Sequence, residues 1–228
     1  MTRLRVAVVL AGCGHRDGAE IREAVFTLLA LDEAEAQVQC FAPDVEQLDV
    51  IDHLTGKPMQ ETRSVLREAA RIARGDVKAL SEFRVGDFDA LVFPGGNGAA
   101  KNLSDFAVQG SKAVVRKDVR AAVESMHKAG KPLGFICITP ASVGATVLGT
   151  TGVALTAGAA NDPSASAIAA LGATHVPCAT TDTISDRQHR VVSTPAYMDG
   201  DARTRDVYAG IKKLVDEVVA MCHATVPA

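Results

Sequence analysis

Cys137 is the candidate nucleophile, because its thiol lies where backbone N–H groups at a helix start can activate it. It ends the apolar run 133–137, typical of a buried strand, and it precedes Thr139-Pro140, where proline suits the first position of a helix. A thiol at a helix start faces unpaired backbone N–H groups, which favour the thiolate and lower its pKa. The next N–H, that of Ile138, can also stabilise an oxyanion. A buried structural cysteine fits the same position, so both interpretations stay open on position alone.

Glu20 is the candidate acid–base partner of this thiol. It lies near the start of the first predicted helix, after Asp17-Gly18. Burial would raise the pKa of its carboxyl group, so that the group could donate a hydrogen bond and shuttle a proton. The alternative is a capping box, because Asp17 and Glu20 have the spacing at which two side chains satisfy the first N–H groups of a helix. The residue types alone favour the cap.

A glycine-rich turn supplies backbone groups for the same pocket. Gly95 and Gly96 follow the predicted strand 90–93, and glycine lets the backbone approach a ligand closely and present its N–H groups. We expect both to contribute to an oxyanion site, although a glycine pair also makes a plain tight turn. Cys13 and Asn97, in the turns after the first and third strands, are expected to line the pocket.

Other motifs in the chain are incomplete. Residues 12–18 resemble a dinucleotide fingerprint, but Asp17 stands where the third glycine is needed and would repel a pyrophosphate. Cys13 with His15, and His175 with Cys178, are pairs of potential metal ligands that lack a second half. We therefore predict no cofactor and no metal site.

Short β-branched runs alternate with longer amphipathic stretches. Strands are predicted at residues 3–10, 38–41, 90–93, 132–137, 153–156 and 190–193, and helices at 19–34, 61–73, 115–128, 140–148, 164–171 and 204–221. In the first helix, Ile21, Val25, Leu28 and Leu29 have helical spacing. This alternation predicts βαβ units, hence one α/β domain over residues 1–228, with a mostly parallel sheet and helices on both faces. Ligands bind beyond the carboxyl ends of such strands, so the turns 12–20, 94–101 and 137–141 should converge on one pocket.

The composition excludes several classes of protein. A chain of 228 residues that is 47% hydrophobic can bury a real core, which argues against disorder. A net charge of −3 offers no basic stripe for nucleic acid, and no apolar run reaches the ~18–20 residues of a membrane span. Five cysteines, an odd number, argue against a disulfide framework and indicate a reducing compartment. We therefore predict a cytoplasmic protein.

Four motifs in order resemble the ElbB branch of the ThiJ/PfpI superfamily, which is class I glutamine amidotransferase-like. They are GCGHRDGAEI at 12–21, FPGGNGAAKNL at 93–103, KPLGFICITPA at 131–141 and TPAYM at 194–198. The resemblance implies a flavodoxin-like three-layer sandwich and a homodimer. It also implies a reactive elbow cysteine with a hydrogen-bonded glutamate, here Cys137 and Glu20. Gly95, Gly96 and the N–H of Ile138 would form the oxyanion site.

The same resemblance implies an activity. Members of this type are cofactor-independent glyoxalases, which convert glyoxal or a similar small dicarbonyl to a hydroxy acid. A hemithioacetal on Cys137 would be the intermediate, and Glu20 would move the proton. Protease-like and amidase-like relatives carry a histidine directly after the cysteine, where this chain has Ile138, so peptidase or amidotransferase activity is not expected.

Three alternatives stay open. Cys137 could be a redox sensor that oxidises without turnover. The same pair could serve a deglycase or amidase-type hydrolase, which would release an amine or ammonia from an adduct. The chain could also be a scaffold that kept the fold and lost the rate.

Overall fold

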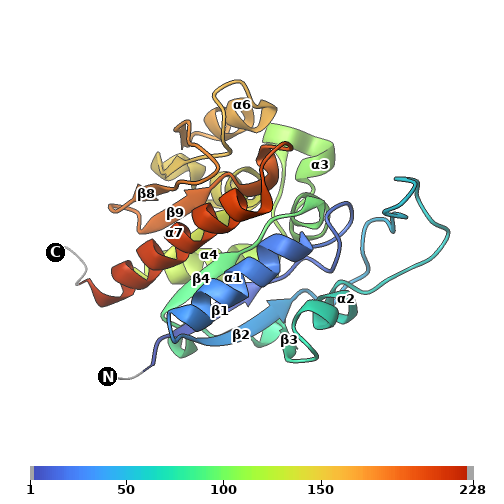
Figure 1. Ribbon diagram of the computed structural model, residues 1–228, viewed down its shortest axis with the longest axis horizontal. Coiled ribbons are helices and arrows are strands. Elements are labelled where there is room, and N and C mark those ends of the chain that lie inside the picture. Colours follow the sequence, from blue (N-terminus) through green and yellow to red (C-terminus); the bar gives the residue numbers. More distant parts are fainter. Residues whose placement is uncertain (1–2, 225–228) are drawn as a thin grey trace.

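The computed structural model describes residues 3–224, and its centre is a seven-stranded sheet (Figure 1). The strand order is β3-β2-β1-β4-β5-β9-β8, and all neighbours pair in parallel except β8 with β9. The strands of this sheet are β1 (Arg5–Val9), β2 (Gln37–Ala42), β3 (Val77–Ala79), β4 (Ala90–Phe93), β5 (Leu133–Ile136), β8 (Ile184–Asp186) and β9 (Val191–Thr194). A separate parallel pair consists of β6 (Ala154–Leu155) and β7 (Thr174–His175).

Helices cover both faces of the sheet, as the alternating pattern predicts. They are α1 (Ile21–Glu33), α2 (Val65–Ile72), α3 (Phe106–Gln109), α4 (Lys117–Lys128), α5 (Thr146–Leu148), α6 (Pro163–Ala170) and α7 (Thr204–His223). Side chains of α1, α2 and α7 share one core cluster, and those of α4 and α6 share the other. In Figure 1, α1 and α7 lie side by side across the near face of the sheet. The flavodoxin-like three-layer sandwich is thereby confirmed.

The strands alternate their side chains between the two cores. On β1, Val6 and Val8 pack in the α1 and α7 cluster, whereas Ala7 and Val9 pack in the α4 cluster. Because both faces are covered, such a strand is apolar throughout, which is the pattern that predicts it. The predicted strand at 90–93 has the observed bounds of β4. The strands β3, β7 and β8, which have two or three residues each, are missing from the prediction.

The first helix buries a different face from the one its apolar spacing indicates. Ile21, Val25 and Leu29, which predict the helix, are 47%, 46% and 44% exposed. The side facing the core consists of small and polar residues together with one leucine: Glu23, Ala24, Thr27, Ala30 and Leu31. Small side chains let the helix approach the sheet closely, and they bring Glu23 into the interior.

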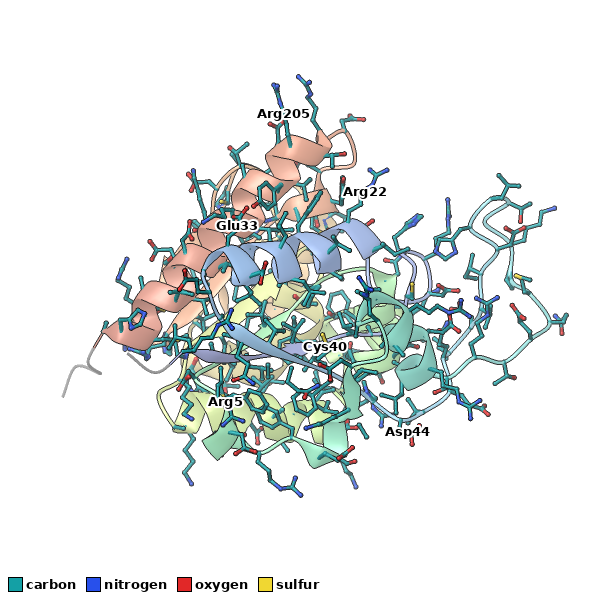
Figure 2. The ribbon with its side chains drawn as sticks, turned by 60° about the horizontal axis from the view of Figure 1, so that its bottom comes forward. Arg5, Arg22, Glu33, Cys40, Asp44 and Arg205 are labelled. Atoms are coloured by element: carbon teal, nitrogen blue, oxygen red, sulfur yellow. The ribbon has the colours of Figure 1, made fainter. Side chains whose placement is uncertain are left out.

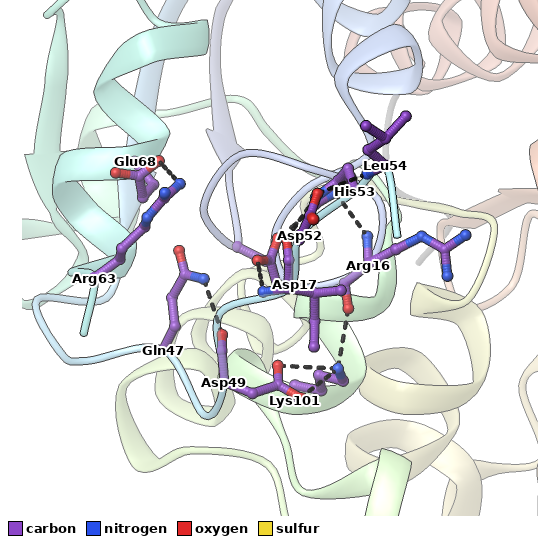
Figure 3. Close-up of polar contacts among 12 residues, drawn as sticks. Arg16, Asp17, Gln47, Asp49, Asp52, His53, Leu54, Arg63, Glu68 and Lys101 are labelled. Carbon is purple, nitrogen blue, oxygen red and sulfur yellow. Dashed lines mark hydrogen bonds and ion pairs between the residues drawn. The ribbon is translucent and has the colours of Figure 1, made fainter. Parts of the chain in front are cut away.

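A long loop between β2 and α2 packs against the turn that follows β1. Residues 43–64 extend away from the body and return to it (Figure 1), and two isolated bridges join Glu46 to Ser64 and Ile51 to Pro58. Figure 3 shows how this segment is fastened: the Ile51 N–H donates to Asp17 Oδ2 at 2.7 Å, and Lys101 Nζ lies 2.8 Å from Asp49 Oδ2. Lys101 also donates to the Arg16 carbonyl, so it is a structural cation rather than a solvated one.

Among residues 3–224, no helix combines the length and the apolar character that crossing a membrane requires.

Candidate functional site

Cys137 occupies a sharp elbow between β5 and the helical segment that follows. Its φ is +64°, a left-handed conformation that strains a residue with a Cβ unless its surroundings hold it. Its N–H donates to the Thr194 carbonyl at 3.0 Å, and the residue is 7% exposed. The following segment is a π-helix (Pro140–Ala145) that continues into α5. The elbow holds the thiol at the carboxyl end of the sheet.

Thr139 fixes this elbow from below. Its buried hydroxyl accepts the Ile136 N–H at 2.7 Å and lies 3.0 Å from the Phe93 carbonyl. The hydroxyl therefore ties together the ends of β4 and β5 beneath Cys137. In the sequence, Thr139 only marks the start of a helix. Its contacts with β4 and β5 depend on the fold and have no signal in the residue spacing.

Glu23 is the carboxyl group beside the thiol. Its side chain is fully buried and hydrogen-bonded to Cys137. Oε2 accepts the Gly95 N–H at 3.0 Å, and Oε1 accepts the Tyr197 N–H at 3.1 Å. Three segments far apart in the sequence thus converge on one carboxyl group. The turns 12–20, 94–101 and 137–141 do meet, and the segment 194–198 joins them.

The prediction that Glu20 contacts the thiol is wrong. Glu20 is the N-cap of α1, and its Oε2 accepts the Glu23 N–H at 2.7 Å. The capping interpretation is the correct one for this residue, although Asp17 is not its partner; Asp17 instead binds the Ile51 N–H of the loop 43–64. Because α1 begins at Ile21, the carboxyl that points into the sheet belongs to the residue three positions after Glu20.

Burial and coupling set the protonation of the pair. Burial raises the pKa of Glu23 to about 8, with the charge of Glu20 adding to the effect, so Glu23 is protonated near neutral pH. The pKa of the Cys137 thiol is raised by burial, contrary to the lowering expected at a helix start, and an ionised Glu23 raises it further. The N–H groups of Gly96 and Ile138 act on the sulfur in the opposite direction. Simultaneous ionisation of Glu23 and Cys137 is therefore disfavoured. When Glu23 is protonated, its charge no longer opposes the thiolate, and the N–H groups of Gly96 and Ile138 favour it.

Gly95 cannot carry a side chain here. An added Cβ would lie 2.4 Å from the Cys137 Cβ and 2.5 Å from Glu23 Oε2. Its N–H is bound to Glu23, so the expected contribution of Gly95 to an oxyanion site is not what the structure shows. The N–H groups that reach the sulfur are those of Gly96 and Ile138.

A cleft of about 580 Å³ opens over the start of α1. Its lining residues are His15, Glu20, Ile21, Arg22, Tyr197 and Gly200. Its walls belong to the segments that hold the thiol, since the Glu20 N–H donates to the Gly95 carbonyl at 2.9 Å.

Cys13 and Asn97 are not among the residues that line this cleft, contrary to expectation. The charges that act most on the Cys13 thiol come from Glu68 and Arg71 on α2, and burial raises its pKa. Asn97 is exposed, and its backbone N–H donates to the His15 carbonyl. The turns were located correctly, but side-chain direction within a turn depends on backbone angles that the sequence does not reveal.

The raised pKa of Glu23 predicts a specific pH dependence of stability. Between its ordinary pKa of 4.5 and about 8, the unfolded chain loses this proton while the folded chain keeps it. Its contribution to the free energy of unfolding is therefore fully present below pH 4.5 and is lost as pH rises through about 8. The slope is at most about 1.4 kcal/mol per pH unit. Urea unfolding from pH 5 to pH 8 should show wild type losing stability relative to Glu23→Gln; parallel profiles would contradict the assignment.

The described part of the chain offers no obvious metal centre. Within residues 3–224, no three His, Cys, Asp or Glu side chains are grouped so that they could hold a metal ion. All five cysteines are free thiols. Burial raises the pKa of Cys40 to about 12 and that of Cys222 to about 11. What distinguishes Cys137 from these two is its position at the elbow beside Glu23, because Cys40 lies within β2 and Cys222 within α7.

Comparison with known proteins places this site in a family. No protein-family model matches the chain. The human glutamine amidotransferase-like class 1 domain-containing protein 3, mitochondrial, is 44% identical over 95% of this chain and 83% of its own length. This chain belongs to the ES1, or glutamine amidotransferase-like class 1, family. The mitochondrial ES1 protein homolog of Rattus norvegicus is 41% identical over 96% of the chain and 84% of its own length.

Solved structures agree with this family membership. An isoprenoid biosynthesis protein with an amidotransferase-like domain from Ehrlichia chaffeensis superposes with a TM-score of 0.89 at 39% identity, covering 96% of this chain and 99% of its own. A DJ-1 superfamily protein from Salmonella typhimurium, at 23% identity and a TM-score of 0.54, shares the fold over 96% of this chain and 88% of its own. The chain therefore shares its fold with DJ-1 superfamily proteins, and the amidotransferase-like resemblance drawn from the four motifs is confirmed.

The cytoplasmic location expected from the cysteines is contradicted by these relatives. The human, rat and Danio rerio proteins, at 44%, 41% and 32% identity, are all mitochondrial. Reduced thiols separate reducing from oxidising compartments, but they do not distinguish one reducing compartment from another. The composition therefore could not support so specific a location.

Proposed function

We propose that this protein is a cofactor-independent glyoxalase that acts on glyoxal or a similar small dicarbonyl through Cys137. The observation that carries the proposal is the hydrogen-bonded pair of Cys137 and a fully buried Glu23, with the N–H groups of Gly96 and Ile138 on the sulfur. A nucleophile, a proton carrier and two oxyanion donors are the groups this chemistry requires. Ile138 follows the cysteine in place of a histidine, so Glu23 takes over the proton transfers.

In the first step, the Cys137 sulfur adds to one aldehyde carbon. The reactive form of the pair holds one proton, with the sulfur as thiolate and Glu23 protonated, and it forms when the thiol proton is lost to solvent. A C–S bond forms, the C=O π bond breaks, and the carbonyl oxygen takes the proton of Glu23, which gives a hemithioacetal and leaves Glu23 ionised. While negative charge develops on that oxygen, the N–H groups of Gly96 and Ile138 can stabilise it.

The next steps move hydrogen between the two carbons without an external oxidant. Glu23, now ionised, removes the proton from the carbon that carries sulfur while the neighbouring carbonyl becomes the other half of an enediolate. Reprotonation of that neighbouring carbon, with the hydroxyl proton of the sulfur-bearing carbon passing to the second oxygen, gives a thioester of the hydroxy acid. Water then adds to the thioester, the C–S bond breaks, and the pair recovers its proton. One carbon is oxidised and its neighbour reduced, so the reaction balances within the substrate.

Product analysis tests this proposal against its alternatives. The purified protein is incubated with glyoxal in buffer free of thiols and metals, and separately with the adduct of glyoxal and an amine. The proposal expects glycolate from free glyoxal at rates near the usual ~1–1000 per second. Amine release from the adduct without glycolate from free glyoxal would instead identify a deglycase. Selective peroxide oxidation of Cys137 with no turnover of either would identify a redox sensor.

We also propose that the protein forms the homodimer implied by the family resemblance. Ile21, Val25 and Leu29 lie on one face of α1, about one turn apart, and all three are substantially exposed. A second copy could cover this face symmetrically around a two-fold axis. Light scattering should therefore find a dimer for wild type and for Val108→Glu, whose site is 70% exposed on α3, and a monomer for Val25→Glu. A monomeric wild type would overturn the proposal.

A further inference from the structure

The cleft over the start of α1, whose lining includes Tyr197, contains a cation whose hydrogen-bond partners are neutral. Arg22 Nη1 lies 3.1 Å from the Tyr197 hydroxyl and 3.5 Å from Thr204 Oγ1. Its guanidinium carbon lies 5.9 Å from the centre of the Tyr197 ring. Figure 2 shows Arg22 at the surface end of α1, with its guanidinium directed outward. Because a guanidinium has five N–H donors, this one retains donors for a ligand.

Tyr197 connects this cation to the reacting groups. Its backbone N–H binds Glu23 Oε1, while its hydroxyl binds Arg22. The residue before it, Ala196, has a φ of +46°, so the turn that presents Tyr197 is sharply bent. At the other end of this turn, the Thr194 carbonyl accepts the Cys137 N–H. One short segment thereby fixes the thiol, the carboxyl and the guanidinium relative to one another.

The other polar side chains of the cleft also affect how well it binds a charged ligand. Burial lowers the pKa of His15, and the neighbouring His53 adds to this, so His15 is neutral at pH 7. Glu20 carries a negative charge, although its carboxylate is drawn to the Glu23 N–H at the start of α1. An anionic ligand gains from Arg22 and is partly repelled by Glu20, so the carboxylate of Glu20 limits the affinity for an anion.

We infer that the substrate is an anionic dicarbonyl, with a carboxylate that binds Arg22 while its aldehyde reacts at Cys137. This inference rests on the proposed glyoxalase function and names the class of substrate. Guanidinium and carboxylate form paired, charge-assisted hydrogen bonds, which give both affinity and orientation. Arg22 is thus the specificity-determining residue, and Tyr197 is the positioning residue that holds it.

Two dicarbonyls that differ only in charge test the inference: 4,5-dioxopentanoate and its methyl ester. Wild type should favour the acid over the ester in kcat/KM by roughly 10- to 100-fold, the value of a charged hydrogen bond. Arg22→Gln should bring this ratio close to one, and Glu20→Gln should raise it above the wild-type ratio. Arg205→Gln is the matched control, because Arg205 lies on α7 outside the cleft, near Asp206, and should leave the ratio unchanged (Figure 2).

The outcomes separate this inference from the function on which it rests. Turnover of both compounds by wild type with equal kcat/KM would overturn the anionic substrate and leave the glyoxalase intact. If glyoxal is converted but neither compound is, the inference is overturned and the glyoxalase stands. If glyoxal is not converted either, the glyoxalase fails, and binding decides the inference. Calorimetry with 4-oxopentanoate on Cys137→Ala should then show binding that Arg22→Gln removes; no binding, or binding that survives Arg22→Gln, would overturn it.

Discussion

Replacing Cys137 by alanine is expected to lower glyoxal turnover roughly 10⁴-fold or more, to the uncatalysed background. The loss follows from chemistry rather than from folding, because the change removes one buried sulfur atom and leaves the elbow backbone in place. Alanine also lacks the thiol that carries the hemithioacetal. The measurement is glycolate formation by purified Cys137→Ala, with thermal unfolding to verify that the fold survives.

A second cysteine provides the matched control. Cys178 lies in a partly exposed loop, where burial raises its pKa to about 11, and it contacts the Ala179 carbonyl rather than an acid. Cys178→Ala should retain wild-type turnover. Turnover that survives in Cys137→Ala, or that disappears in Cys178→Ala, would show that the elbow thiol is not the nucleophile.

Replacing Glu23 by glutamine is expected to lower turnover about 10²- to 10⁴-fold, the usual contribution of a positioned acid–base group. Gly95 and Tyr197 donate to different oxygens of Glu23, so the single oxygen of glutamine can keep only one of these two contacts, and some loss of stability is expected beside the loss of turnover. Glutamine cannot take a proton from carbon. Glycolate formation measured beside the unfolding curve separates loss of chemistry from loss of structure.

Glu20→Gln is the informative comparison for that variant. Glu20 caps α1, and a glutamine oxygen can also accept the Glu23 N–H, so turnover of neutral glyoxal should fall far less than in Glu23→Gln. The reverse ranking, with the larger loss in Glu20→Gln, would restore Glu20 as the proton carrier and contradict the assignment made from the structure.

The nucleophile could be predicted from sequence because local patterns determine its position. An apolar run, a cysteine and then Thr139-Pro140 indicate a strand end and a helix start, and the alternation of elements places that point at the carboxyl edge of a parallel sheet. The same reasoning correctly brought three loops together. Each of these inferences needs only the order of elements and not their exact orientation.

The acid could not be predicted in the same way, because its position depends on the rotation of one helix. Of the four apolar residues whose spacing predicts α1, Leu28 packs partly buried against the core, whereas Ile21, Val25 and Leu29 are exposed. Glu23 lies on the buried side. Ala24, Thr27 and Ala30 also have helical spacing with Glu23, and this small-residue face was the available signal. Apolar residues at helical spacing show that a helix has an apolar face. In a single sequence, this spacing does not show whether that face packs on the core.

The contribution of Tyr197 depends on tertiary contacts alone. Its hydrogen bonds reach Glu23 and Arg22, which lie far from it in sequence, through a bend at Ala196 that requires a positive φ. Neither alanine nor tyrosine signals such a conformation. The motif at 194–198 supported the family resemblance, but only the fold shows its structural role.

Proton NMR of the product formed in D₂O tests the Cys137–Glu23 account most directly. An enediolate whose proton is carried by Glu23 exchanges with solvent, so wild type should convert glyoxal to glycolate that carries deuterium on its methylene carbon. Glu23→Gln should form little of this product, and Cys137→Ala none. Deuterated glycolate formed by Glu23→Gln as fast as by wild type would contradict proton transfer by Glu23.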